Sequence, residues 1–261
     1  MPSLAEIPAW LVLAKAGIVF IWFALFFVAE RLAPAVEPSA ATGIPRLGRN
    51  FAFWLINTLL SPLVVIPLTA WAAAHRPYLR PDWWSDGPGL ALDVLLLDFL
   101  IYWWHRANHE WPLLWRFHEV HHLDRFLDST SAIRFHFGEV LLSAGARAAI
   151  VLLLGFPFAS IVLFESLLLC ATIFHHSNLR LPAGVERALS LIIITPGIHW
   201  VHHRAVRADT DSNYGTLFSF WDRILRTRSP TRRTPEMPIG VEGEDERALP
   251  ALLARPFRRR R

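Results

Sequence analysis

The chain has 261 residues, of which 53% are hydrophobic and 18% are charged, and its formal net charge is +4. Soluble domains carry about 25% charged residues, so this composition argues against a soluble protein and favours one that lies largely in a membrane. The single cysteine, Cys170, excludes a disulfide framework and a cysteine-ligated metal cluster. The basic residues are arginines apart from Lys15, and they gather in the C-terminal tail. In so apolar a chain this tail predicts contact with anionic lipid headgroups and not with nucleic acid.

Four apolar regions have lengths that suit a bilayer core, which takes about 20 residues in a helix. They cover residues 8–29, 51–74, 89–104 and 140–174. The fourth region has room for a hairpin of two short helices, and Gly155-Phe156-Pro157 predicts the break between them. The first region is too long for a signal peptide and lacks a small-residue cleavage site, so we expect it to be retained.

The order of these regions predicts which residues share a side of the membrane. His105 and His175 share a side only if an even number of crossings separates them, and the predicted hairpin supplies two. The arginine-rich tail and the loop with Arg31, Arg46 and Arg49 then lie on the side of the histidines, which the positive-inside rule assigns to the cytoplasm. We therefore expect an all-α integral membrane protein with about four transmembrane helices and a cytoplasmic helical cap that carries the histidines.

All but His75 of the twelve histidines lie between residues 105 and 203, and most of them are clustered. Imidazole is the commonest side-chain metal ligand, and residues three or four apart in a helix lie on one face. A single zinc ion takes three or four protein ligands, so this many histidines predict a site for two metal ions. The clusters are one HxxxH and two HxxHH motifs: His105 and His109; His118, His121 and His122; His199, His202 and His203.

Two carboxylates next to these clusters admit more than one interpretation. Asp98 precedes His105 by two helical turns, where it would accept a hydrogen bond from a ligand imidazole, and an ion pair with Arg106 is the alternative. His118-Glu119-Val120-His121-His122 also matches HExxH, the zinc protease pattern in which Glu119 would be the general base. That pattern leaves the cluster at 199–203 without a role. Because that cluster repeats the spacing without a glutamate, the shared feature is metal binding.

Over roughly residues 90–227 the sequence resembles the fatty acid hydroxylase/sterol desaturase superfamily. The resemblance rests on an ordered set of segments: Asp98 to His109, Leu114 to His122, Arg134-Phe135-His136 with Glu139, Phe174 to Asn178, Thr195 to His203, Asn213-Tyr214-Gly215 and Trp221-Asp222-Arg223. It implies an integral-membrane, non-haem di-iron oxidoreductase of lipid biosynthesis. Such an enzyme uses O₂ to hydroxylate or desaturate a sterol, a fatty acyl chain or a related lipid.

The resemblance also assigns metal ligands residue by residue. Nine histidines match iron-ligand positions: His105, His109, His118, His121, His122, His176, His199, His202 and His203. The candidates for a further ligand or for a neighbour of the ligands are His136, His175, Asp98, Glu119, Asn178, Asn213 and Asp222. At His136 the sequence departs from the family, in which proline commonly follows and Phe137 stands here.

Redox chemistry favours iron over zinc. Imidazole binds zinc, copper, iron and nickel, so ligand type does not select the metal. Zinc has no redox chemistry, whereas two iron ions share the electrons needed to split O₂. The sequence shows no GxGxxG fingerprint and no His-Pro-Gly-Gly motif, so we expect an external electron donor, a ferredoxin or a cytochrome b5 with its reductase. The alternatives are a zinc-dependent membrane protease or hydrolase and a non-enzymatic metal or haem carrier.

We divide the chain into three parts: N-terminal membrane helices at 1–87, a hydroxylase-like catalytic domain at 88–227, and a basic, weakly ordered tail at 228–261. Glu165 lies inside an apolar run, and a carboxylate within a membrane is a candidate functional group, with Arg147 as its expected partner. The preference for arginine over lysine suggests a GC-rich bacterial source and hence a bacterial inner membrane.

Overall fold

The protein is described from a computed structural model that covers residues 9–38, 43–77, 81, 84 and 87–258. Over this part of the chain the regular structure is helical, apart from isolated β-bridges. The predicted all-α class is therefore confirmed. The arginines at 259–261, which belong to the predicted lipid contact, lie outside the described residues.

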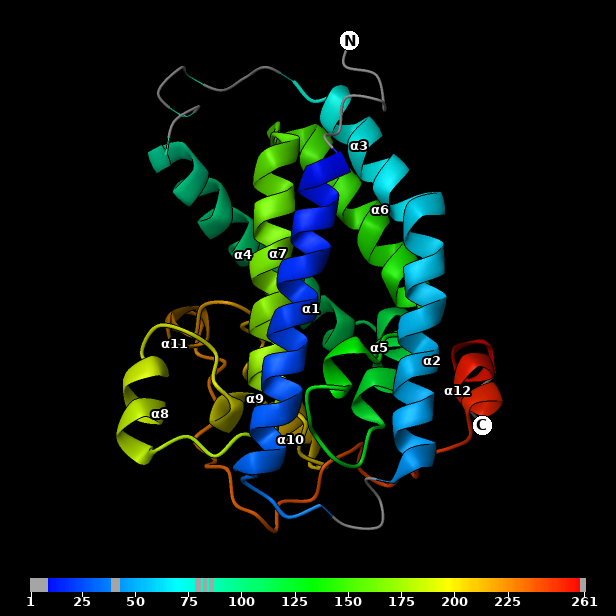
Figure 1. The fold of residues 1–261 in the computed structure, drawn as a ribbon, viewed down its shortest axis with the longest axis vertical. Helices are drawn as coiled ribbons and strands as arrows, with labels where there is room; N and C mark the ends of the chain where they lie inside the picture. Colours follow the sequence, from blue (N-terminus) through cyan, green and yellow to red (C-terminus); the bar gives the residue numbers. More distant parts are fainter. Residues whose placement is uncertain (1–8, 39–42, 78–80, 82–83, 85–86, 259–261) are drawn as a thin grey trace.

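Among the described residues, five helices are long and apolar enough to cross a bilayer. The four predicted regions contain five helices because the fourth region is the predicted hairpin, and Figure 1 shows the helices side by side. The helices are α1 (Ala9–Leu32), the continuous run of α2 (Ile44–Leu60), η3 (Ser61–Val65) and α3 (Ile66–Ala74), then α4 (Gly87–Glu110), α6 (Phe137–Leu154) and α7 (Phe158–His176).

The hairpin turns where the sequence predicts it. Gly155 ends α6 in the left-handed conformation with a φ of 71°, and Pro157 caps the start of α7. A Cβ atom at residue 155 would lie 2.7 Å from the carbonyl oxygen of Pro77, so both the backbone conformation and the space favour glycine.

The second crossing is one helix of 31 residues. It is about 46 Å long at 1.5 Å per residue, which exceeds a hydrocarbon core of about 30 Å. Pro62 lies in the π-helical turn η3, where the missing N–H disturbs the regular hydrogen-bond ladder. The excess length lets the first turns of α2 reach beyond the bilayer and pack on the polar end of the molecule.

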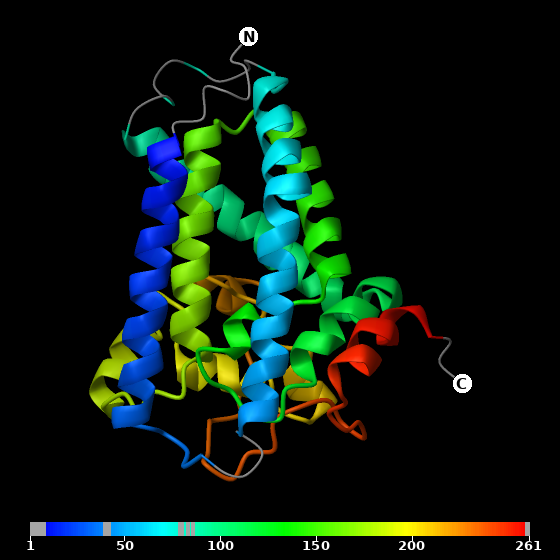
Figure 2. The same ribbon diagram turned by 45° about the vertical axis from the view of Figure 1, so that its right-hand side comes forward.

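The cap consists of short helices gathered at one end of the bundle (Figures 1 and 2). The ends of α4 and α7 and the starts of α2 and α6 reach this end, and the start of α1 lies at the opposite end. The cap elements are α5 (Pro112–His122), η5 (Ser131–Ile133), α8 (Ala183–Leu189), α9 (Pro196–His202), α10 (Arg207–Thr210), α11 (Phe220–Ile224), α12 (Leu249–Ala254) and η6 (Arg255–Phe257).

The long helices bury little of their apolar surface against each other. Ala72, Val94, Ala148, Phe156 and Ile161 belong to one small core between α3, α4, α6 and α7. Much of the remaining apolar surface faces outward, as a bilayer requires and water would not allow. The exposed side chains include Phe20, Ile21, Leu63 and Leu153, each about 70% exposed or more: 71%, 69%, 75% and 73%.

A buried arginine fastens α2 to the cap. Arg46 donates hydrogen bonds to Asp124 at 2.6 and 2.8 Å and to Asp128 at 2.8 Å, and it also reaches the carbonyl oxygen of Phe126. Burial acts to raise the pKa of Asp124, but the charges of Arg46 and Arg134 lower it to about 2. The loop that follows α5 is therefore held to α2 by charged groups that satisfy one another.

The C-terminal segment differs from the sequence prediction, which was wrong for the described residues 228–258. Met237 and Ile239 are buried against Trp200 of α9, and Leu252 is buried against Val120 of α5. A composition rich in proline, arginine and glutamate conceals this packing because only a few isolated apolar residues make the contacts. The segment thus covers the two helices that carry the HxxHH motifs.

We predict that Arg46→Met lowers the free energy of unfolding by about 3–5 kcal/mol, because it leaves two buried carboxylates without their cation. Arg49→Met is the matched control on the same helix. Its partner Glu246 keeps Arg134, so we expect a loss of about 1 kcal/mol or less. Denaturant titrations in detergent measure both values, and equal losses would contradict the role of Arg46.

Candidate metal centre

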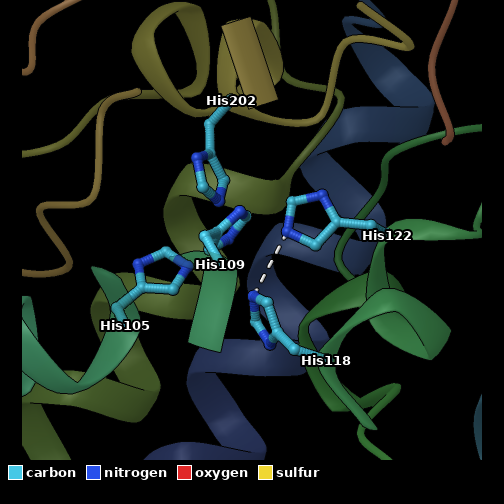
Figure 3. A group of neighbouring side chains, drawn as sticks. All are labelled: His105, His109, His118, His122 and His202. Atoms are coloured by element: carbon cyan, nitrogen blue, oxygen red, sulfur yellow. Dashed lines mark hydrogen bonds between the residues drawn. The ribbon is translucent and has the colours of Figure 1, made fainter. Parts of the chain in front are cut away.

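Nine imidazole rings converge in the cap to form two groups of candidate metal ligands. Within each group the candidate ligand atoms all lie within 4.8 Å of one another. Figure 3 shows the first group, whose side chains come from α4, α5 and α9 and point toward one another. The first group is His105, His109, His118, His122 and His202, and the second is His121, His176, His199 and His203. These nine are the histidines that the sequence analysis assigns as ligands.

Each HxxHH motif supplies both groups. On α5, His118 and His122 belong to the first group and His121 to the second. The motif at 199–203 is divided the opposite way: His202 faces the first group, and its two partners face the second. The expectation that all rings of one motif share a face is therefore wrong. At 3.6 residues per turn, positions i+3 and i+4 diverge by 100° around the helix.

The two groups adjoin each other. The rings of His122 and His203, one from each group, are stacked with centroids 4.1 Å apart. His118 and His121, also from different groups, have centroids 5.5 Å apart. A metal ion in each group would therefore have the other ion as its neighbour.

The approach of the Nε2 atoms fits a metal ion. In the second group, Nε2 of His176 lies 3.0 Å from Nε2 of His121 and 3.0 Å from Nε2 of His199. Metal–nitrogen bonds of about 2.0–2.1 Å place neighbouring ligand nitrogens roughly 3 Å apart. A cation between these atoms would relieve the repulsion of their lone pairs.

Five rings are oriented by a hydrogen bond through Nδ1. A proton on Nδ1 leaves the lone pair of Nε2 free for a metal ion, so the hydrogen-bond pattern assigns the tautomer that a ligand needs. The acceptors are Tyr214 O for His105 at 2.8 Å, Glu139 Oε1 for His118 at 2.7 Å, Arg134 O for His121 at 3.0 Å, Thr172 O for His176 at 2.8 Å and Ser212 O for His202 at 2.6 Å.

Two Nε2 atoms of the first group are evidence that the group fits a metal ion. Nε2 of His109 and Nε2 of His202 are buried without a hydrogen-bond partner among the described residues. A buried polar atom without a partner costs about 1–3 kcal/mol, and such atoms are rare in folded proteins. The residues present therefore fit a bound metal ion, which would satisfy both atoms.

Burial favours the neutral form of five rings of the cap. It lowers the pKa of His121, His122, His199 and His203 well below the ordinary value. It lowers the pKa of His202 to about 3, although the carbonyl oxygen of Ser212 acts in the opposite direction. Since a metal ion binds the deprotonated imidazole, these rings are ready to bind at neutral pH.

Two carboxylates approach the first group at its edge. Glu139 accepts the hydrogen bond from His118, and Asp211 lies 3.5 Å from Nδ1 of His109. The candidate ligands themselves are neutral imidazoles, so a pair of metal ions would keep most of its positive charge. That charge would favour the binding of an anion at the centre.

Asp98 supports the site indirectly. Its carboxylate accepts hydrogen bonds from the backbone N–H groups of Leu217 and Phe218 and from Nε1 of Trp221. These bonds hold the loop whose Tyr214 carbonyl orients His105. The predicted contact of Asp98 with an imidazole is replaced by this contact with the loop.

Asp222 and Asn213 belong to the same loop. Asp222 accepts hydrogen bonds from the backbone of Tyr214 at 2.8 Å and Gly215 at 2.9 Å. Asn213 has a φ of 51°, a conformation that asparagine tolerates better than most residues, and it lies between the two carbonyls that orient His202 and His105. A Cβ atom at Gly215 would lie 2.8 Å from Asp222 Oδ2, so a side chain there would push the loop away.

The other candidates lie outside both groups. His175 is buried with its ring centroid 4.0 Å from that of His199. His136 caps α6 and contacts the carbonyl oxygen of Leu253 at 3.1 Å. Asn178 bonds through its side chain to both backbone groups of Val36. Glu119 is held by two hydrogen bonds from Arg255, at 2.9 and 3.2 Å.

The backbone groups that orient the rings could not be predicted from the sequence. Four of the five Nδ1 acceptors are backbone carbonyls, which leave no trace in side-chain identity. The fifth, Glu139, is one turn after His136 in the motif that supports the family resemblance, and this proximity is the signal that could have indicated it.

A cavity of about 560 Å³ lies in the membrane region. Its walls come from α1, α2, η3, α3, η5 and α7, and they are mainly apolar. Ile133 and Ile173 are the lining residues next in sequence to the second group. Ile133 precedes Arg134, whose carbonyl orients His121, and Ile173 is one turn before His176. The wall of the cavity therefore adjoins segments that carry the second group.

Comparison with known proteins agrees with this geometry. The chain is 30% identical to the ornithine lipid hydroxylase OlsE of Rhizobium tropici over 199 residues, which are 76% of this chain and 59% of that protein. It is 31% identical to a cholesterol 25-hydroxylase-like protein of Danio rerio over 163 residues, 58% of this chain and 62% of that protein. It is 30% identical to an alkylglycerol monooxygenase of Danio rerio over 148 residues, 57% of this chain and 30% of that protein.

The chain thus spans less than two thirds of the length of these relatives. No solved structure matches it. The fatty acid hydroxylase family matches residues 90–227, which include α4, all nine grouped histidines and the loop held by Asp98 and Asp222. The chain is therefore a multi-pass membrane protein that belongs to the fatty acid hydroxylase family.

Proposed function

We propose that this protein is a membrane di-iron oxygenase that hydroxylates or desaturates a lipid with O₂. The observation that carries the proposal is the pair of adjoining groups of buried, neutral imidazoles at the end of an apolar cavity in the membrane region. Family membership supports a lipid substrate. The relatives include an ornithine lipid hydroxylase and an alkylglycerol monooxygenase, and these names support oxidation at a C–H bond of a lipid.

The nine grouped histidines would hold the two ions, and bound iron would supply the redox chemistry that activates O₂. The protein itself would contribute by positioning the ligand rings. Glu139 and the carbonyls of Arg134, Thr172, Ser212 and Tyr214 hold the rings in the ligand tautomer before the metal arrives. Rings fixed in this way lose little entropy on binding, which favours a stable centre.

The apolar cavity would bind and orient the hydrocarbon part of the substrate. Its walls exclude water from the reacting C–H bond, and its end near Ile133 and Ile173 sets which carbon lies nearest the centre. Fixing one carbon there makes the reaction effectively intramolecular, which accounts for a large share of an enzyme's rate. Exclusion of water also prevents loss of the oxidant.

The contacts of Glu119 argue against a zinc protease or hydrolase. A general base for water needs a free carboxylate, and Arg255 binds both oxygens of Glu119. The protease pattern would use only His118 and His122 of α5, and both lie in the first group together with histidines of α4 and α9. A metal or haem carrier needs no apolar cavity that ends beside the ligands.

Electrons would come from an external carrier, a ferredoxin or a cytochrome b5 with its reductase. The bacterial relative supports a bacterial inner membrane as the location. The arrangement of the helices, with the cap and the loop of Arg31, Arg46 and Arg49 at one end, supports a cytoplasmic metal centre under the positive-inside rule.

We predict that His121→Ala and His202→Ala each lower the iron content of the purified protein, because each removes a ligand from a different group. His75→Ala is the matched control, since His75 follows α3 at the far end of the bundle. Elemental analysis of protein loaded with iron measures the effect. Iron content that is unchanged in both ligand variants would remove these residues from the centre.

We predict that Glu139→Gln weakens metal binding by about 10–100-fold, because it loses the carboxylate that fixes the His118 ring. Glu119→Gln serves as the control and is expected to keep both the iron and the oxidative activity. Titration of the apoprotein with metal against a competing chelator gives the affinities. An essential Glu119 combined with a single bound zinc would support the hydrolase instead.

We predict that cells producing the intact protein accumulate a lipid that has gained one oxygen atom or lost two hydrogen atoms. Cells producing His202→Ala should lack this lipid. Mass spectrometry of total lipid extracts compares the two with cells that lack the protein. Identical lipid profiles in all three, from protein shown to contain iron, would contradict the proposed reaction.

A further inference from the structure

Three charged side chains meet inside the membrane region, away from the metal centre. Lys15 of α1 and Arg147 of α6 both form ion pairs with the carboxylate of Glu165 on α7. The side chains are 20–24% exposed: 20% for Glu165, 22% for Lys15 and 24% for Arg147. The expected pair of Glu165 and Arg147 is present, and Lys15, the lone lysine of the chain, is added to it.

Two of the three charged side chains lie in the wall of the cavity. Lys15 and Glu165 line the cavity, and the other described lining residues carry no charge. Phe20, Phe23, Trp54 and Val162 are examples of these uncharged neighbours. A ligand with a long apolar body would therefore meet one charged contact, at one place.

The charges of the cluster do not cancel. Two cations face one carboxylate, so the cluster carries a net charge of +1 in surroundings that are otherwise apolar. An uncompensated charge at membrane depth is unfavourable, and charged residues there are usually paired or face a ligand. A second anion in the cavity would complete the pairing.

The position of the cluster fits one end of a long lipid. Glu165 precedes His176 on α7 by eleven residues, or about 16 Å along the helix. The cavity covers this interval, since its lining runs from Lys15 to Ile173. A chain whose anionic end lies at Lys15 would extend along α7 toward the second histidine group.

The arrangement of the helices gives such a lipid a way in from the bilayer. Figure 2 shows α1 beside α7, and the cavity lies between this pair and the continuous run of α2, η3 and α3. Phe20 is 71% exposed and Trp54 is 45% exposed, one on each side of the cavity. A lipid can enter sideways between them without leaving the membrane.

We propose that Lys15 binds the anionic group of a long-chain amphiphile whose chain fills the cavity, while Arg147 pairs with Glu165 and leaves Lys15 available for that group. This site rests on the proposed function, because it places the chain of the substrate at the centre. It narrows the substrate class to lipids with one carboxylate or phosphate, oxidised at a carbon remote from that group. Lys15 acts on binding and position only, since it lies far from the reacting bond.

The test is a binding measurement with full-length apoprotein in detergent. The probes are hexadecanoate, hexadecan-1-ol and hexadecyl phosphate, which share a chain and differ in the charged group. We expect wild-type protein to bind hexadecanoate at least tenfold more tightly than the alcohol. Lys15→Met should abolish that preference and leave the affinity for the alcohol unchanged. Lys15→Arg should retain the preference, and Arg31→Met is the control cation at the opposite end of α1.

Equal affinity of the wild-type protein for the acid and the alcohol would overturn the proposal, and this comparison needs no variant. If Lys15→Met lost affinity for both the acid and the alcohol, the proposal would also be overturned. The substitution would then have changed the shape of the cavity and not the recognition of the charged group. Tight binding of the phosphate probe would indicate a phospholipid, and binding of the carboxylate alone would indicate a free fatty acid. The binding test uses the apoprotein, so a negative result contradicts the lipid site and leaves the oxygenase proposal intact. A lipid that binds in this way but is not oxidised by the iron-loaded protein contradicts only the oxygenase proposal.

Discussion

The hydrogen bond from Nδ1 of a histidine to a fixed oxygen is the interaction on which the rest of the structure depends. It decides the tautomer, and with it whether Nε2 is a ligand or a donor. In this protein the acceptors belong to segments far apart in the chain: the end of α7, the turn before α6, and the loop after α10. Each of those segments must be in place before the rings can converge. The buried contacts of Arg46, Asp98 and Asp222 hold these acceptors still and thereby serve the centre.

The two HxxHH motifs explain how few helices can supply both groups of candidate ligands. A helix presents positions i and i+4 within 40° of each other and position i+3 on the other side of i. One motif therefore offers two rings to one group and one ring to the other. Because α5 and α9 divide their rings in opposite ways, each group receives rings from both helices. The remaining ligands come from α4, which serves the first group, and from α7, which serves the second.

Much of this could be predicted from the sequence because the relevant signals are local. Spacing and family resemblance identified the nine histidines that the structure brings together, and Gly155 with Pro157 identified the hairpin turn. The division of each motif between two groups depends on how helices cross, which no single helix encodes. Helical periodicity shows which residues of α4 share a face with Asp98, and it therefore suggested His105 or Arg106 as its partner. It cannot show that the loop at residue 217 packs against Asp98. The packing of 228–258 depends on single residues such as Leu252, whose partners lie far away in sequence.

The packing of the C-terminal segment also has a consequence for biogenesis. Met237, Ile239 and Leu252 cover α9 and α5, and the chain synthesises them after every histidine of the two groups. While the ribosome is still extending the nascent polypeptide, Trp200 of α9 and Val120 of α5 lack the side chains that bury them. The packing of the cap is therefore completed late, only after residues 237–252 have emerged and docked.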